Sequence, residues 1–227
     1  ELTIAGTKTG SLTVSCPSGS VAVSGGFSHP LDLRVWESIK DGNGWKVSAT
    51  NKSSVNKILN VTVTCMFNSG GTTDEKVEQV KANAMGTTQL TATCPSGSSI
   101  TGGGWVALND NAFKVIQSSK SGNGWQIIVE NNTTMEPWTS IYAVCLSGAP
   151  GTTTQESNLN NTIGASTSTY AQKLCPGDSI VTGGGFSITK ELIVVNNSVS
   201  ANGWITYVYN NSLEDKQFDT FTICYQP

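Results

Sequence analysis

Apolar and polar residues alternate along short stretches of this chain, and one such stretch occurs three times. After each Asn-Gly-Trp tripeptide, apolar residues take every second position, as in Trp45, Val47 and Ala49. Similar runs begin at Trp125 and Trp204. Alternation with one apolar face is typical of a half-buried β-strand. The pattern therefore predicts three equivalent strands, each starting at one of these tryptophans.

Further strands flank each of these three. A preceding strand is predicted from the apolar pairs Leu33 and Val35, Phe113 and Val115, and Ile193 and Val195. Asn and Gly in the intervening turns tolerate the positive φ that tight hairpins need. A closing strand leads into a cysteine, as in "NVTVTC". Because long helical patterns are absent, the predicted fold class is all-β.

The spacing of cysteines, aromatic residues and asparagines indicates three internal repeats, over residues 1–66, 67–146 and 147–227. In each repeat a cysteine precedes an aromatic residue by eleven positions, the Asn-Gly-Trp tryptophan precedes an asparagine by six, and a second cysteine follows that asparagine by fourteen. The recurring residues are Cys16, Phe27, Trp45, Asn51 and Cys65; Cys94, Trp105, Trp125, Asn131 and Cys145; and Cys175, Phe186, Trp204, Asn210 and Cys224.

The six cysteines predict three disulfides and an oxidising, extracellular setting. Six cysteines allow fifteen pairings, among which the repeat symmetry favours one bridge per repeat. The favoured pairs are Cys16–Cys65, Cys94–Cys145 and Cys175–Cys224. Each would close a loop of about fifty residues, worth roughly 4 kcal/mol. Zinc binding is a weaker alternative, because His29 is the only histidine.

The other recurring residues favour structural roles. We expect the three tryptophans to pack inside, because they lie at inward strand positions; the alternative is a sugar-stacking platform used three times. The glycine triplets predict bulges or close backbone contacts rather than a phosphate loop, since neither a helix start nor a lysine follows them. Asn51, Asn131 and Asn210 begin Asn-x-Ser/Thr triplets and are expected in Asx- or ST-type turns rather than as glycan acceptors.

Two architectures satisfy these predictions. In the first, the three repeats form one pseudo-threefold β-prism with a shared core. In the second, they form three tandem small β domains, which the Gly- and Pro-containing segment 147–154 would favour. We favour the prism, because three inward tryptophans suit a shared axis.

The sequence resembles two groups of proteins. Cys-Pro-x-Gly in the first two repeats, Gly-Gly-Gly-aromatic in the last two (Ser-Gly-Gly-Phe in the first), and Asn-Gly-Trp and a final Cys in all three, over 16–65, 94–145 and 175–224, resemble repeats of secreted bacterial proteins of unassigned function. The threefold glycine-rich layout also resembles β-prism proteins, such as jacalin-type lectins and the vitelline membrane outer layer protein. The repeats here are longer, and no jacalin-type sugar loop is present, so no binding residue carries over.

Composition and motifs weigh against several function classes. Only 13% of residues are charged and the net charge is −3, without the basic stripe that nucleic-acid binding needs. No apolar run has the length of a membrane span. A lone His29 offers no catalytic triad, and the sequences Asp41-Gly-Asn43 and Asn109-Asp110-Asn111 fit turns better than calcium sites. We therefore expect no enzyme, no catalytic residue, no metal and no cofactor.

Ligand-binding candidates are aromatic residues that differ between repeats. Trp36 takes the place of Ile116 and Asn196, and Trp138 that of Ile58 and Gln217. Tyr207 and Tyr209 replace Ser48 and Thr50. Exposed aromatic side chains on a polar β surface anchor sugars or proteins well. The leading hypothesis is a secreted binding or adhesion protein, lectin-like and multivalent, with a glycan or cell-surface protein as partner. The alternatives are a self-associating surface or matrix protein and a toxin or pore-forming component.

Overall fold

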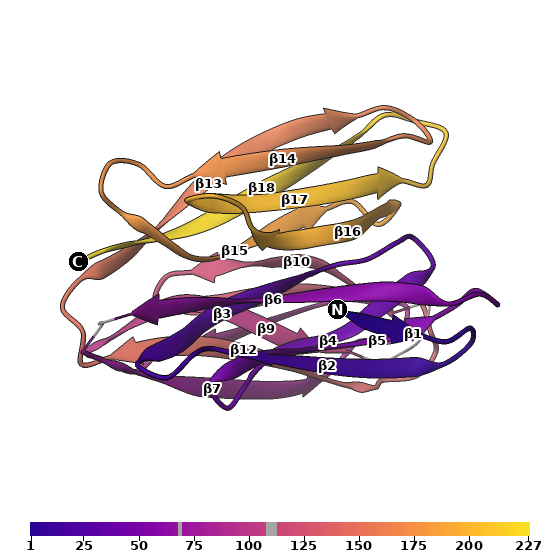
Figure 1. Ribbon diagram of the computed structural model, residues 1–227. Helices are drawn as coiled ribbons and strands as arrows, with labels where there is room; N and C mark the ends of the chain where they lie inside the picture. Colours follow the sequence, from indigo (N-terminus) through magenta and orange to yellow (C-terminus); the bar gives the residue numbers. More distant parts are fainter. Residues whose placement is uncertain (68–69, 108–112) are drawn as a thin grey trace.

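The structure, a computed structural model, describes residues 1–67, 70–107 and 113–227, and all its regular elements within these ranges are strands (Figure 1). The first repeat forms β1 (Leu2–Ile4), β2 (Thr9–Ser15), β3 (Ser20–Ser28), β4 (Leu33–Asp41), β5 (Gly44–Asn51) and β6 (Lys57–Phe67). The second forms β7 (Thr72–Lys81), β8 (Gly86–Thr93), β9 (Ser98–Val106), β10 (Phe113–Ser121), β11 (Gly124–Asn131) and β12 (Trp138–Ser147). The third forms β13 (Thr152–Ile163), β14 (Ser168–Leu174), β15 (Ile180–Ile188), β16 (Leu192–Val199), β17 (Gly203–Asn210) and β18 (Lys216–Gln226).

The strands form three six-stranded antiparallel sheets, and each sheet combines strands of two repeats. Sheet 1 has the order β1-β6-β3-β16-β17-β14, sheet 2 the order β13-β18-β15-β10-β11-β8, and sheet 3 the order β2-β5-β4-β9-β12-β7. In Figure 1 the orange to gold strands β14, β17 and β16 of the third repeat lie above β3, β6 and β1 of the first, and these six strands form sheet 1. This arrangement confirms the prism-like prediction. The tandem alternative is wrong, because it requires each sheet to belong to one repeat.

The glycine triplets lie where the repeats meet. Strands β3, β9 and β15 contact one another at the centre, and each also pairs with the fourth strand of another repeat. A Cβ atom added at Gly104 would overlap the carbonyl oxygen of Ser38, and one added at Gly185 would overlap that of Ser118. The seam between repeats therefore requires glycine, which confirms the predicted close backbone contact.

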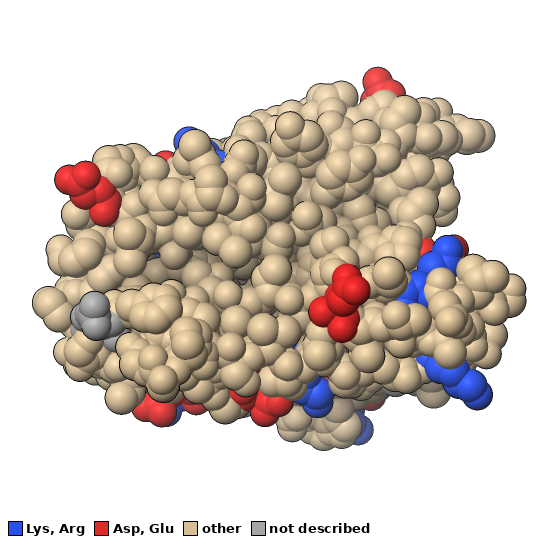
Figure 2. All heavy atoms as spheres, viewed as in Figure 1, with Lys and Arg blue, Asp and Glu red and all other residues tan. Residues whose placement is uncertain are grey.

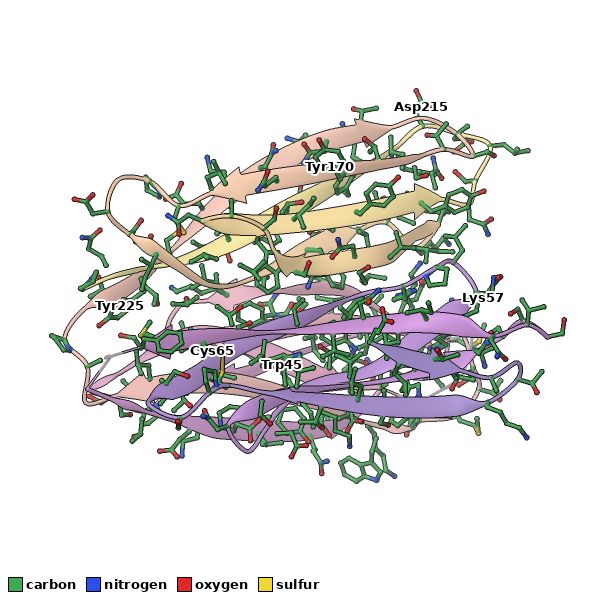
Figure 3. The ribbon with its side chains drawn as sticks, in the orientation of Figure 1. Trp45, Lys57, Cys65, Tyr170, Asp215 and Tyr225 are labelled. Atoms are coloured by element: carbon green, nitrogen blue, oxygen red, sulfur yellow. A yellow bond between two sulfur atoms is a disulfide. The ribbon has the colours of Figure 1, made fainter. Side chains whose placement is uncertain are left out.

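The three Asn-Gly-Trp tryptophans lie in the interior, between the two half-sheets of their own repeat. Each is at most 1% exposed, and Figure 3 shows Trp45 between the strands of the first repeat. Each indole N–H donates to an acceptor on the neighbouring strand, which offsets the cost of burying this polar group. The pairs are Trp45 with Ser38 at 3.0 Å, Trp125 with Ser118 at 2.9 Å and Trp204 with Asn197 at 2.8 Å.

The asparagine of each tripeptide forms three hydrogen bonds at the end of the repeat where the disulfide lies. The backbone carbonyl of Asn43 accepts a hydrogen bond from the N–H of Cys16, while its side chain accepts from Ala22 N at 2.8 Å and donates to Ser20 O at 2.9 Å. Asn123 and Asn202 make the same bonds in their repeats. The disulfides join the predicted pairs, Cys16–Cys65, Cys94–Cys145 and Cys175–Cys224.

One alignment from the sequence is wrong by a residue. The fourth strand of each repeat has a bulge, and β16 shifts register between Val194 and Asn196. The bulged residues are therefore Trp36, Ile116 and Val195, so Trp36 corresponds to Val195 and not to Asn196. Accordingly, Leu192 is the buried residue that starts β16, in the place predicted for Ile193. Residues 192–195 are all apolar, so alternation does not fix the frame there, whereas Leu33, Phe113 and Leu192 all precede their Asn-Gly-Trp tryptophan by twelve positions.

Candidate functional site

The four predicted aromatic candidates lie on two different sheets. Tyr207 and Tyr209 are half-buried residues of β17 in sheet 1. Trp36 and Trp138 belong to sheet 3, on β4 and β12. Trp138 is 63% exposed, and the ammonium of Lys81 lies 5.9 Å from the centre of its ring. The structure therefore brings the two tyrosines together and leaves Trp138 on a separate face.

A third tyrosine, Tyr170, joins Tyr207 and Tyr209. Tyr170 of β14 lies directly opposite Tyr207 in the register of the sheet, and their ring centres are 6.2 Å apart with nearly parallel planes. It is 59% exposed, and Figure 3 shows it on β14. We call Tyr170, Tyr207 and Tyr209 the tyrosine face. Sequence comparison missed Tyr170, although it also breaks the repeat, since Ser11 and Gln89 hold the equivalent places.

A small groove adjoins the tyrosine face. It has a volume of about 110 Å³, and its lining includes Tyr207, Tyr209, Ser168 and Val195 together with the loop residues His29, Pro30 and Leu31. His29 is buried, stacks on Phe27 at 5.5 Å, and its Nδ1 lies 2.9 Å from the carbonyl oxygen of Pro30. Burial lowers the pKa of His29 to about 4, so the imidazole is neutral at pH 7.

The sheet around the tyrosine face carries almost no charge. Among the residues of its six strands, all of which the structure describes, only Lys57 and Lys173 are charged. Lys57 pairs with Asp32 at 2.7 Å and Lys173 with Glu156 at 3.8 Å. Figure 2, in the orientation of Figure 1, accordingly shows few charged side chains over β14, β17, β16 and β3. This face thus offers aromatic rings, amides and hydroxyls.

At the positions of sheet 3 that correspond to the tyrosine face and its neighbouring bulge, large and small residues are exchanged. Sheet 1 has the small Val195 on its bulge and large tyrosines on β17, whereas sheet 3 has the large Trp36 on its bulge and the small Ser48 on β5. The indole nitrogen of Trp36 is buried and has no hydrogen-bond partner among the described residues. Trp36 is half-buried, as Tyr207 and Tyr209 are, but no second aromatic residue stands beside it on β5, all of which the structure describes, so sheet 3 lacks the cluster of rings that sheet 1 has.

The molecule also contains a larger cavity, where the three repeats meet at one end of the prism. Its volume is about 560 Å³, within the range typical of small-molecule sites. Phe27, Trp105 and Phe186 pack there edge to face, with ring centres 6.1 Å and 6.0 Å apart. Charged side chains also line it, namely Arg34, Lys52, Lys114, Lys190, Asp32, Glu130 and Glu191. We call it the axial cavity.

Among the described residues, no group of three or more His, Cys, Asp or Glu side chains could hold a metal ion. In the same ranges no helix is long and apolar enough to cross a membrane. Asp41 accepts a hydrogen bond from Thr13 at 2.9 Å in the turn predicted for it. The sequence Asn109-Asp110-Asn111 lies outside the described residues.

Neither a scan against protein families nor a search of the curated proteins finds a match for this chain. The likeness to secreted bacterial repeat proteins therefore stays a prediction from the motifs alone. The three disulfides indicate an oxidising environment.

Proposed function

We propose that this is a secreted carbohydrate-binding protein that holds a neutral glycan against the tyrosine face. One observation carries the proposal: three partly exposed tyrosines from adjacent strands stand together on a sheet with almost no charge. Sugar rings present apolar C–H faces that pack on aromatic rings, and hydroxyl edges that need polar partners. Tyrosine supplies both in one side chain.

The surroundings of the tyrosine face support a neutral ligand. Gln172, Ser168 and Asn196 lie on the strands around it. Their amides and hydroxyls donate and accept hydrogen bonds without charge, as sugar hydroxyls require. The small groove beside Tyr209 has room for one compact substituent, such as a hydroxymethyl or an acetamido methyl group.

The proposal places one such site on each chain. The equivalent residues are Ser11, Ser48 and Thr50 in sheet 3, and Gln89, Ile128 and Glu130 in sheet 2. Neither set contains an aromatic ring, so the proposed site has no equivalent in sheet 2 or sheet 3. Multivalent adhesion would then require several copies of the chain on one surface.

A glycan array that includes insoluble neutral polysaccharides tests this function. The key variant carries Tyr207→Ser and Tyr209→Thr, the residues that the first repeat holds at these places, and we expect it to fold. It should lose at least tenfold in affinity for the glycan that the wild type binds. The matched control, Trp138→Ile, removes an exposed aromatic from another face and should bind normally. The proposal is contradicted if the wild type binds no neutral glycan on the array, or if the tyrosine variant binds as tightly as the wild type.

A further inference from the structure

The axial cavity is a second site with a chemistry different from that of the tyrosine face, and it lies next to that face: His29 and Leu31 line both the cavity and the small groove, and Ile193 of the cavity pairs with Tyr209 across the strands. We infer that it binds one small amphipathic anion, with an aromatic or aliphatic body and a single carboxylate or sulfonate group. The inference rests on three features of the cavity: an aromatic floor, an apolar side and a cationic side.

The aromatic floor is built by equivalent residues of the three repeats. Phe27, Trp105 and Phe186 are each buried, and their rings meet edge to face. Each ring is at most 4% exposed, so the cluster forms a closed apolar base beneath the cavity. Because each ring is held by a central strand of a different sheet, the floor is preformed.

The cationic side comes from two equivalent residues that bridge neighbouring repeats. The guanidinium of Arg34 donates to the carbonyl of Phe113, and the ammonium of Lys114 donates to the carbonyl of Leu192. Lys114 also donates to the carbonyl of Lys190 at 2.7 Å. Among the described residues these carbonyls take two of its three N–H groups, and the third can meet an anion.

The apolar side arises where the third repeat breaks this pattern. Ile193 stands in the place of Arg34 and Lys114, and it has no group to donate. Ile188 and Val194 line the cavity beside it. The cavity is therefore polarised, with two cations on one side and a hydrocarbon surface on the other, which sets the orientation of an amphipathic ligand.

Charge in the lining favours an anion over a cation. Four cations, Arg34, Lys52, Lys114 and Lys190, line the cavity with three carboxylates, Asp32, Glu130 and Glu191. Asp32 already pairs with Lys57, a cation outside the lining. Two carboxylates therefore remain against four cations, and the excess is positive.

Fluorescence titration tests this site with two probes of similar shape, 8-anilinonaphthalene-1-sulfonate and the neutral N-phenyl-1-naphthylamine. The wild type should bind one equivalent of each, with saturation. Lys114→Met should weaken the sulfonate at least fivefold and leave the neutral probe within twofold. Ile193→Arg, which introduces into the third repeat the arginine that the first repeat has at this position, should weaken the neutral probe at least tenfold by filling the apolar side.

The control is Ile180→Arg, the same change at an isoleucine that is 41% exposed on β15, and thermal melts establish that each variant is folded. The variant Tyr170→Ser, which carries the residue of the first repeat on β14, should keep full probe binding, so the axial site is tested independently of glycan binding. The inference is overturned if the wild type shows no saturable binding, if Lys114→Met binds the sulfonate as the control does, or if Ile193→Arg binds the neutral probe as the control does.

Discussion

The indole of Trp125 lies directly against the backbone of Gly103, so closely that a Cβ atom at Gly103 would overlap the ring. The same relationship joins Trp45 to Gly25 and Trp204 to Gly184. It explains why the Asn-Gly-Trp tripeptide and the glycine triplet recur together: the tryptophan of one half-sheet fills the space that glycine leaves on the other. The two motifs form one joint, repeated three times.

We expect Gly103→Ala to destabilise the protein by at least about 2 kcal/mol, because overpacking a filled core displaces a rigid indole or the backbone. Urea unfolding monitored by tryptophan fluorescence measures the loss. Gly86→Ala is the matched control, since a Cβ there meets its nearest neighbour at an ordinary 3.6 Å; its stability should change by less than about 0.5 kcal/mol. Equal stability of the two variants would contradict the proposed joint.

Removing one disulfide should cost about 4 kcal/mol. The bridge Cys94–Cys145 spans 51 residues, and opening a loop of this size restores that much chain entropy to the unfolded state. The double substitution Cys94→Ala and Cys145→Ala, followed by denaturant unfolding, measures the effect. A loss below about 1 kcal/mol would show that the bridge does not restrain the unfolded chain as expected.

Asn131 should be essential for stability although it makes no contact with a ligand in this account. Its amide donates to the carbonyls of Asn83 at 3.0 Å and Met135 at 2.8 Å, and its carbonyl accepts from Thr133 N at 3.0 Å and Thr133 Oγ1 at 2.7 Å. Asn131→Ala leaves buried backbone groups unpaired, at a cost of roughly 2–4 kcal/mol. Asn132→Ala, at an exposed neighbour, is the control and should be nearly neutral.

Acid should destabilise the fold through His29. Burial lowers its pKa from 6.5 to about 4, so the unfolded chain binds a proton more readily than the folded one. The stabilisation is complete above pH 6.5 and is lost as the pH falls towards 4. The linkage amounts to roughly 3 kcal/mol between pH 7 and pH 4.

The variant His29→Ala, which copies Ala107 of the second repeat, isolates this effect. The free energy of unfolding should fall between pH 7 and pH 4 in both proteins, but the fall should be smaller in the variant by roughly 3 kcal/mol. The carboxylates titrate in both proteins and cancel in the comparison. An identical pH dependence in the two would mean that His29 is not buried as a neutral ring.

Local patterns predicted the elements within each repeat but not how the repeats interlock. The spacing of Cys16, Trp45 and Asn51 is local, so it identified the strands, the hairpin and the disulfide. The pairing of β3 with β16 is not local, because alternation marks which face of a strand is buried and not which strand lies at its edge.

The candidate sites were predictable to a similar extent. Comparison of the repeats identified Tyr207 and Tyr209, because both lie at fixed distances from the Asn-Gly-Trp tryptophan and replace Ser48 and Thr50 of the first repeat. Tyr170 was missed, since it lies on the second strand of its repeat, before the first cysteine at which the recurring spacing starts. The axial cavity depends on Phe27, Trp105 and Phe186 meeting across three sheets. The sequence shows that they recur, but only the closed prism brings them together.

We propose that the ligand surface lies where the repeats differ, on a scaffold that they share. Backbone amide NMR shifts, recorded as the neutral glycan selected on the array is added, test it most directly. The account predicts shifts concentrated in 168–172 and 205–210, with the equivalent residues 9–13, 46–51, 87–91 and 126–131 unmoved. Equal shifts in all three sets, or shifts centred on Trp138, would contradict it.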